Sequence, residues 1–272
     1  MNYRHAYHAG NWADCMKHAV LVWLLRALAQ KQKPFFVLDT HAGQGQYDLE
    51  SEEARRTGEA ETGIRRLMAA PHSAFADYLG LVRQLGLYPG SPVLIRATLR
   101  PGDRLACCEL HPEEHAALRA RFVRDPQVQV HLRDGFGALV ALLPPAERRG
   151  LVFIDPPYEA ADEYLRVAVG LATANSRFPG GVLAAWYPIK HRAPVRTMHA
   201  TIRDVGMRDV VATEFMLRAP LDAARLNGCG LVVVNPPWGF EIELTPLLAA
   251  LLQRLGNREP GAEVGVVRLA DE

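Results

Sequence analysis

The sequence predicts an α/β protein built on one mostly parallel sheet of seven strands. Short apolar runs alternate with longer segments of helical periodicity, which is typical of parallel strands joined by crossover helices. Residues 151–154 and 231–234 are apolar without interruption, as expected for a sheet buried on both faces. With 272 residues, 49% of them hydrophobic and 22% charged, the chain has an ordinary soluble globular composition. We therefore expect a single domain spanning residues 1–272.

The elements follow one another in a regular order. The expected strands are residues 35–39, 104–109, 128–132, 151–155, 181–187, 210–216 and 231–235. The expected helices are residues 17–30, 112–124, 136–142, 162–174, 195–205 and 246–255.

One stretch interrupts the alternation, because about sixty residues separate the first two strands where a single crossover needs far fewer. Residues 64–70 and 75–85 have helical periodicity there, and Tyr88-Pro89-Gly90-Ser91-Pro92 has the composition of a turn. The sequence thus predicts a small helical insertion, residues 46–103, after the first strand.

Composition excludes several classes of protein. The net charge of +1 and the pI of about 7.8 do not indicate a nucleic-acid partner, so any phosphate contacts must come from local clusters. The four cysteines show no C-x-x-C spacing, which indicates buried, reduced thiols and no metal site. The first seventeen residues lack the apolar core of a signal peptide, and the longest apolar stretch, residues 19–29, is too short to cross a bilayer. A cytoplasmic protein without a membrane partner is expected.

A glycine turn follows the first strand, in Leu38-Asp39-Thr40-His41-Ala42-Gly43-Gln44-Gly45. Such a turn lets the backbone approach a ligand at the carboxyl edge of a parallel sheet, although an ordinary strand–helix turn has the same pattern. A dinucleotide fold would need a third glycine where this chain has Asp48, in order to seat a pyrophosphate on a helix. S-adenosylmethionine carries no phosphate, so it fits this turn better than NAD.

Acidic residues mark the next two strand ends. Glu109 closes the second strand, where a carboxylate can accept both ribose hydroxyls of a nucleoside. Asp134 follows the third strand and is suited either to an adenine amine or to capping the next helix. Together with Asp39, these residues place acids at three successive strand ends, as a nucleoside cofactor lying across the sheet requires.

The sharpest motif is Asp155-Pro156-Pro157-Tyr158, directly after an apolar strand. The prolines stiffen the chain and remove two backbone donors, which leaves a carboxylate, outward carbonyls and an aromatic face. An adenine amine is a poor nucleophile; accepting its protons at the Asp155 carboxylate and the Pro156 carbonyl would localise the lone pair toward a methyl donor. Tyr158 would stack on the extruded base. The pattern predicts amine methylation, although a structural Pro-Pro turn remains an alternative.

A second motif, Asn235-Pro236-Pro237-Trp238, also follows an apolar strand and can serve the same chemistry. It lies after most of the strands, where it would belong to a terminal hairpin. We therefore interpret it as structural.

Nearly the whole chain resembles the RlmJ family, whose members form N6-methyladenosine at one adenine of bacterial 23S ribosomal RNA. The resemblance rests on Tyr3-Arg4-His5 and His8-Ala9-Gly10-Asn11, on Arg56-Thr57-Gly58-Glu59 and Tyr88-Pro89-Gly90-Ser91-Pro92, and on the Asp155-Pro156-Pro157-Tyr158 motif. It implies a Rossmann-like class I methyltransferase fold with S-adenosyl-L-methionine as cofactor.

The resemblance also implies roles for individual residues. Asp155 matches the family's catalytic acceptor, and Tyr3 matches a position expected to touch the RNA. The other predicted catalytic residues, Pro156 and Tyr158, follow from the chemistry of the motif, and Arg4 is predicted as an RNA contact because it belongs to a basic cluster. The cofactor-binding positions expected from the motifs and the resemblance are Lys17, His18, Asp39, His41, Gly43, Ser91, Glu109, Asp134 and Gly135. Lys17 would pair with the methionine carboxylate, and Ser91 would also cap a helix ahead of Pro92.

The expected partner is 23S ribosomal RNA, with no metal and no obligate protein partner. Five basic clusters are candidates for RNA contacts: Arg4 with His5, Arg55-Arg56, Arg65-Arg66, Arg148-Arg149 and Lys190-His191-Arg192. Two alternatives stay open at this point. One is an adenine-N6 DNA methyltransferase or a DNA-utilisation protein, and the other is an RNA-binding assembly factor with a vestigial methyltransferase fold.

Overall fold

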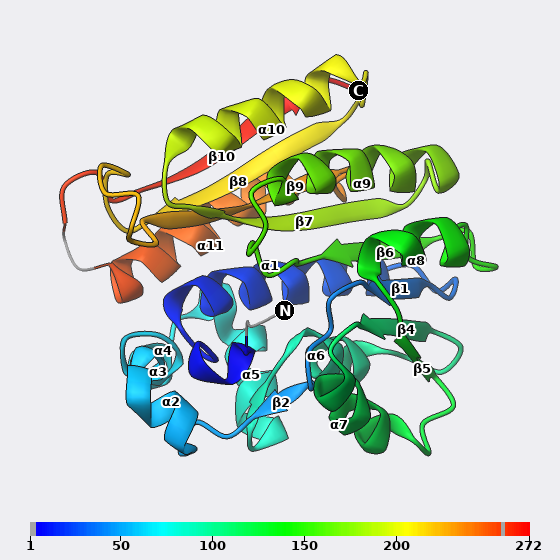
Figure 1. The fold of residues 1–272 in the computed structure, drawn as a ribbon, viewed down its shortest axis with the longest axis horizontal. Helices are drawn as coiled ribbons and strands as arrows, with labels where there is room; N and C mark the ends of the chain where they lie inside the picture. Colours follow the sequence, from blue (N-terminus) through cyan, green and yellow to red (C-terminus); the bar gives the residue numbers. More distant parts are fainter. Residues whose placement is uncertain (1–3, 257–258) are drawn as a thin grey trace.

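The computed structural model describes residues 4–256 and 259–272. Within them the main sheet has eight strands in the order β10-β8-β9-β7-β6-β1-β4-β5 (Figure 1). Their bounds are β1 Phe36–Asp39, β4 Arg104–Glu109, β5 Val128–Leu132, β6 Gly150–Ile154, β7 Val182–Ile189, β8 Val210–Met216, β9 Gly228–Val234 and β10 Glu263–Ala270.

The sheet is parallel from β5 through β4, β1 and β6 to β7. Strand β9 runs antiparallel to both β7 and β8, and β10 runs antiparallel to β8. All seven predicted strands are present, but the predicted count was one too low because β10 was missed. This edge strand has only partly buried or exposed residues and includes Gly265 and Arg268, so it lacks the uninterrupted apolar run of the inner strands.

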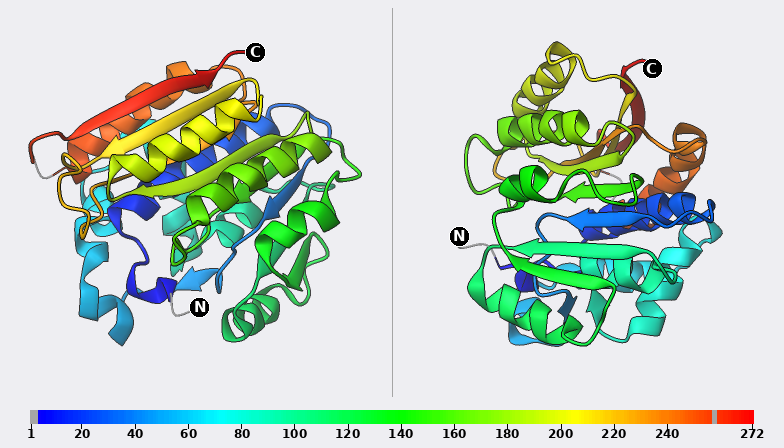
Figure 2. Two further views of the ribbon diagram at one scale, coloured as in Figure 1. Left: turned by 45° about the horizontal axis from the view of Figure 1, so that its top comes forward. Right: turned by 90° about the vertical axis from the view of Figure 1, so that its right-hand side faces the viewer.

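Helices cover both faces of the sheet (Figure 2). One face carries α1 (Trp12–Ala29), α6 (Ser91–Thr98), α7 (Pro112–Phe122) and α11 (Phe240–Leu255). The other carries α8 (Gly135–Leu142), α9 (Glu163–Arg177) and α10 (Arg192–Asp204). Alternate residues of β6 enter the two cores, which explains why its sequence is apolar at every position.

The segment between β1 and β4 contains a two-stranded sheet, β2 (Gln46–Tyr47) and β3 (Tyr88–Pro89). Between these strands lie α2 (Glu52–Thr57), α3 (Glu59–Thr62), α4 (Ile64–Ala69), η2 (Ser73–Phe75) and α5 (Ala76–Leu85). The predicted turn at residues 88–92 is instead strand β3 followed by the start of α6, which contacts β1 and β4. The boundaries 46–103 of an insertion subdomain stay a prediction.

The chain begins with the short 3₁₀ helix η1 (His5–Tyr7) and then α1. Helix α1 starts at Trp12, earlier than the predicted residue 17, because the Asn11 side chain accepts a hydrogen bond from the Asp14 backbone at 2.8 Å. The added turn places Asp14 three residues before Lys17, on the same side of the helix. Among the described helices, α1 included, none combines the length and apolar character that crossing a membrane requires.

The connections reverse direction at β1. The chain passes from β1 to β4 and β5 on one side, then crosses back to β6 and β7 on the other. In sheets of this kind, ligands bind in the crevice outside the carboxyl ends of the strands at the point of reversal. The topology therefore points to the edge where β1 and β6 end, at Asp39 and just before Asp155.

Candidate active site

A cavity of about 670 Å³ opens at this edge, within the size range of small-molecule sites. Its wall includes the predicted catalytic residues Asp155, Pro156 and Tyr158. The predicted cofactor-binding residues that also line it are Lys17, His18, His41, Gly43, Ser91, Glu109, Asp134 and Gly135. The fold thus brings together residues that lie as far apart in the chain as positions 17 and 158.

Asp39 ends β1 just behind this wall. Its side chain is fully buried and accepts a hydrogen bond from the Ser91 hydroxyl at 2.7 Å, while Oδ1 has no hydrogen-bond partner among the described atoms. Burial raises the pKa of the Asp39 carboxyl to about 7. The expectation that Ser91 caps a helix is wrong: Gly90 is the N-cap of α6, and Ser91 is the first helical residue.

Glu109 ties the end of β4 to the glycine turn. Its carboxylate accepts hydrogen bonds from the Gly43 backbone at 2.8 Å and from the His111 backbone at 2.7 Å. Gly43 has φ +59°, and a Cβ there would lie 2.4 Å from the Tyr47 hydroxyl, so a side chain would be strained and crowded. Each carboxylate oxygen keeps a second lone pair, which a ribose hydroxyl can use.

Asp134 caps helix α8, accepting a hydrogen bond from the Gly137 backbone at 2.7 Å. Its second oxygen lies 3.6 Å from the Arg166 guanidinium. The next residue, Gly135, approaches β1 so closely that a Cβ would lie 2.2 Å from the Thr40 carbonyl oxygen. This contact fixes the start of α8 against the end of β1, and the cap interpretation of Asp134 is confirmed.

Two histidines, His18 buried and His41 partly buried, line the cavity as uncharged side chains. A ring nitrogen of His18 hydrogen-bonds the Tyr88 hydroxyl at 3.0 Å, and a ring nitrogen of His41 hydrogen-bonds the Thr40 hydroxyl at 2.8 Å. Burial lowers the pKa of His18 to about 3 and that of His41 to about 4, so both rings are uncharged at neutral pH. A cavity with acids and uncharged histidines suits a positively charged ligand.

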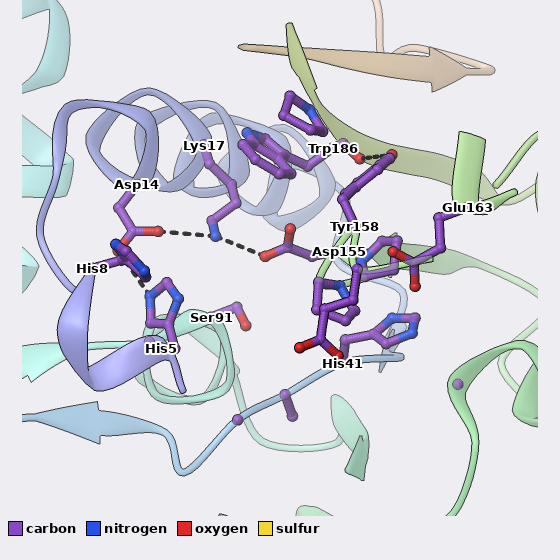
Figure 3. Close-up of a pocket in the computed structure, with 18 of the residues that line it drawn as sticks. His5, His8, Asp14, Lys17, His41, Ser91, Asp155, Tyr158, Glu163 and Trp186 are labelled. Atoms are coloured by element: carbon purple, nitrogen blue, oxygen red, sulfur yellow. Dashed lines mark hydrogen bonds and ion pairs between the residues drawn. The ribbon is translucent and has the colours of Figure 1, made fainter. Parts of the chain in front are cut away.

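The carboxylate of Asp155 stands at the centre of the cavity and pairs with Lys17, whose ammonium lies 2.7 Å from Oδ2 (Figure 3). The same ammonium lies 2.9 Å from Asp14 and 5.4 Å from the centre of the Trp186 ring. Asp14 in turn lies 2.9 Å from His5. Lys17 therefore forms a direct ion pair with Asp155, the predicted catalytic residue. Its predicted pairing with a methionine carboxylate remains a prediction.

Burial alone would raise the pKa of Asp14, but the charges of His5 and Lys17 outweigh burial and hold it well below its usual range. Asp14 is thus an ionised carboxylate with only 3% of its surface exposed. Its importance, and that of Trp186, was missed from the sequence. The three-residue spacing of Asp14 and Lys17 on one helix is the signal that could have found this pair.

Tyr158 adopts a left-handed backbone conformation, with φ +54°. Its hydroxyl donates a hydrogen bond to the Trp186 carbonyl at 2.7 Å, and its ring packs edge-on against Tyr164 with centroids 4.8 Å apart. The turn after Pro157 is therefore anchored to β7, which holds the aromatic ring in the cavity wall. Stacking of this ring on a base remains a prediction.

Other predicted positions lie apart from the cavity. Tyr3 is outside the described residues, so its RNA contact stays a prediction. Arg4 does not line the cavity; its guanidinium lies 3.1 Å from Glu113, and both side chains are exposed. The four cysteines are buried free thiols, as predicted. No cluster of three or more potential metal-ligating side chains occurs among the described residues.

The second motif lies at the opposite edge of the sheet, because β9 runs antiparallel to its neighbours. The Asn235 amide donates to the Pro179 and Gly181 carbonyls at 2.9 and 2.8 Å. Trp238 is 93% exposed. The structural interpretation of this motif agrees with its position.

The parallel strands, the glycine turn after β1 and the acids at three strand ends define a Rossmann-like class I methyltransferase fold. A model of the family described as "Ribosomal RNA large subunit methyltransferase D, RlmJ" matches residues 32–267. The chain belongs to this family, and it is a methyltransferase.

Two named relatives and one solved structure are similar to this chain over nearly its full length. The chain is 40% identical over 263 residues to "Ribosomal RNA large subunit methyltransferase J" of Escherichia coli (strain K12), covering 94% of each. It is 38% identical over 264 residues to the protein of the same name from Haemophilus influenzae, again covering 94% of each. The crystal structure of protein LPL1258 from Legionella pneumophila is 36% identical, with a TM-score of 0.86 over 96% of this chain and 98% of that one.

Proposed function

We propose that this protein transfers a methyl group from S-adenosyl-L-methionine to N6 of one adenine in 23S ribosomal RNA. The observation that carries the proposal is the placement of Asp155 and Pro156 in one cavity with Glu109 and Asp134. A nucleoside cofactor and an adenine amine can then meet at the same sheet edge. We also propose a cytoplasmic location, because the proposed substrate is ribosomal RNA.

The cavity residues fit the cofactor. The Gly43 turn admits close backbone approach, and Glu109 keeps lone pairs for the ribose hydroxyls. His18 and His41 are neutral at pH 7, so they do not repel a sulfonium. When bound, S-adenosyl-L-methionine supplies a methyl group already activated by positively charged sulfur.

The chain's own residues then have to orient the nucleophile. Asp155 accepts one proton of the adenine amine in a hydrogen bond, and the Pro156 carbonyl accepts the other, which directs the nitrogen lone pair toward the methyl group. Tyr158, anchored to Trp186, offers its ring to the flipped base. Lys17 fixes the Asp155 carboxylate through its 2.7 Å contact. Alignment of this kind is the main contribution an enzyme can make to a reaction whose methyl donor is already reactive.

The test is incubation with labelled S-adenosyl-L-methionine and unmethylated 23S ribosomal RNA, followed by mapping of the modified base. We expect N6-methyladenosine at one position. Asp155→Ala should abolish transfer and largely keep cofactor binding, because Lys17 retains its contact with Asp14. Asn235→Ala is the matched control: it removes the other motif at the far edge of the sheet, so its folded fraction should keep activity.

Three results would count against the proposal. Turnover retained by Asp155→Ala would remove the assigned role of that carboxylate. Methylation of duplex DNA in place of RNA would move the substrate to the first alternative. No binding of the cofactor at millimolar concentration would favour an assembly factor with a vestigial fold.

A further inference from the structure

Three residues form a row on one wall of the cavity: Trp186 and Pro188 near the end of β7, and Lys190 directly after the strand. Residues two apart in an extended strand point to the same face, which explains why Trp186 and Pro188 both line the cavity. The row passes from an aromatic ring through a proline to a cation. Aromatic and basic side chains in succession are what a strand of nucleic acid requires, since bases stack and phosphates need positive charge.

The row starts beside the catalytic candidate and leads away from it. Ala185 pairs with Ile154 in the parallel register of β7 and β6, so Trp186 lies level with Asp155. Lys190 is four residues further, about 13 Å at the usual rise of a strand. A base held at Asp155 would therefore have its sugar and phosphate on the way toward Lys190.

The backbone of the row is fixed by hydrogen bonds from three sides. The Tyr158 hydroxyl donates to the Trp186 carbonyl at 2.7 Å, and the Tyr164 hydroxyl donates to the Pro188 carbonyl at 2.9 Å. The fully buried Asn227 amide donates to the Lys190 carbonyl at 2.8 Å. The lysine thus projects from a rigid position at the cavity mouth, which suits a side chain that has to meet a defined phosphate.

Lys190 differs from the other basic side chains of the cavity. Lys17 is paired with Asp14 and Asp155, and Arg166 lies 3.6 Å from Asp134 and over the Phe136 ring. Within the described residues, no carboxylate lies within ion-pair distance of Lys190, and its side chain is exposed.

Most of the other basic clusters predicted from the sequence contain a side chain that already pairs with a carboxylate or a main-chain carbonyl. Arg4 is paired with Glu113, and Arg55 and Arg65 are paired with Glu50. The Arg149 guanidinium donates to main-chain carbonyls, and Arg192, close to Lys190 in the sequence, is paired with Glu214. Lys190 is therefore the cavity cation best placed to meet a new anion.

The anion that Lys190 would bind is not the methionine carboxylate of the cofactor, because the expected cofactor site lies on the other side of Asp155. Glu109 ends β4, and three strand spacings separate β4 from β7, about 14 Å. We propose that Lys190 binds a backbone phosphate of the RNA strand next to the flipped adenine, an inference that rests on the proposed function. Trp186 and Pro188 form the wall along which the nucleotide reaches Asp155.

The test compares Lys190→Ala with Lys31→Ala. The chain has four lysines, and Lys31 is an exposed one just before β1, at the amino ends of the parallel strands and away from the cavity. Affinity for an unmethylated 23S ribosomal RNA transcript is measured at about 50 and 200 mM salt, beside titration with S-adenosyl-L-methionine alone. Binding is scored whether or not the RNA becomes methylated, so failure of the proposed activity and failure of this inference are separate results.

Lys190→Ala should weaken RNA binding about two- to fivefold at low salt, the range of an exposed ion pair. Losing one phosphate contact should also make the drop in affinity between the two salt concentrations about threefold smaller than in the wild type. Lys190→Arg should restore both quantities, and cofactor affinity should not change. Equal RNA binding by Lys190→Ala and Lys31→Ala would overturn the proposal, as would weakened cofactor binding or an unaltered salt dependence.

Discussion

Replacing Asp14 by asparagine tests the ion-pair network that holds Asp155. The substitution keeps the size of the side chain and one oxygen for the Gly10 backbone, which now donates to Asp14 at 3.0 Å. It removes the buried negative charge that faces both Lys17 and His5. Breaking a buried pair costs about 3–5 kcal/mol, and Lys17 keeps Asp155 as a partner, so we expect a loss near the lower end, about 3 kcal/mol.

The pH dependence of this loss has a definite sign. The pKa of Asp14 lies well below its usual range in the folded protein, so its charge stabilises the fold above the unfolded pKa and stops doing so as pH falls toward the folded value. The difference in unfolding free energy between wild type and Asp14→Asn should therefore be present in full at about pH 5. Below about pH 4 it should shrink by about 1.4 kcal/mol per pH unit.

Urea denaturation followed by circular dichroism at several pH values measures both quantities. Asp77→Asn is the control: its partner Arg26 is also on α1, but both side chains are exposed, so the expected loss is at most about 1 kcal/mol. In a Lys17→Met background, Asp14→Asn should cost much less, because the charge it would pair with is absent. A loss below about 1 kcal/mol in the wild-type background, or one unchanged down to pH 3, would refute the reasoning.

Two further predictions concern the strand-end acids. Glu109→Ala should weaken S-adenosyl-L-methionine binding about tenfold or more in a calorimetric titration, because hydrogen bonds to a charged group are lost and the Gly43 turn loses its anchor; unchanged affinity would contradict the assignment. Asp39→Asn should remove one pH-dependent contribution to the unfolding free energy. Burial raises the pKa of Asp39 to about 7, so this contribution should fall by about 4 kcal/mol in the wild type as pH rises from about 4 to about 7, and the difference between wild type and variant should change by that amount; equal pH profiles would argue against a buried carboxylate that lacks a partner for one oxygen.

Strand β10 was missed and Ser91 was wrongly expected to be a helix cap because contacts with distant segments decided both. The inner strands could be recognised in the sequence because burial on both faces requires an uninterrupted apolar run. Strand β10 is an edge strand with Arg268 paired to Asp209 and Glu241, so its sequence looks like a loop. Ser91 was expected to cap α6, but the buried Asp39 carboxylate needs a donor and takes its hydroxyl.

The sequence by itself determined the alternation of strands and helices and the chemistry at the strand ends. Asp39, Glu109 and Asp155 could be picked out because parallel strands end at one edge, whatever lies between them in the chain. Only the tertiary structure showed that the second Pro-Pro motif lies at the opposite edge of the sheet, since strand direction in the sheet depends on long-range pairing. It also decided the pairing of Lys17 with Asp155 and the placement of the row from Trp186 to Lys190 in the same cavity, because contacts between segments more than a hundred residues apart leave no local pattern to read.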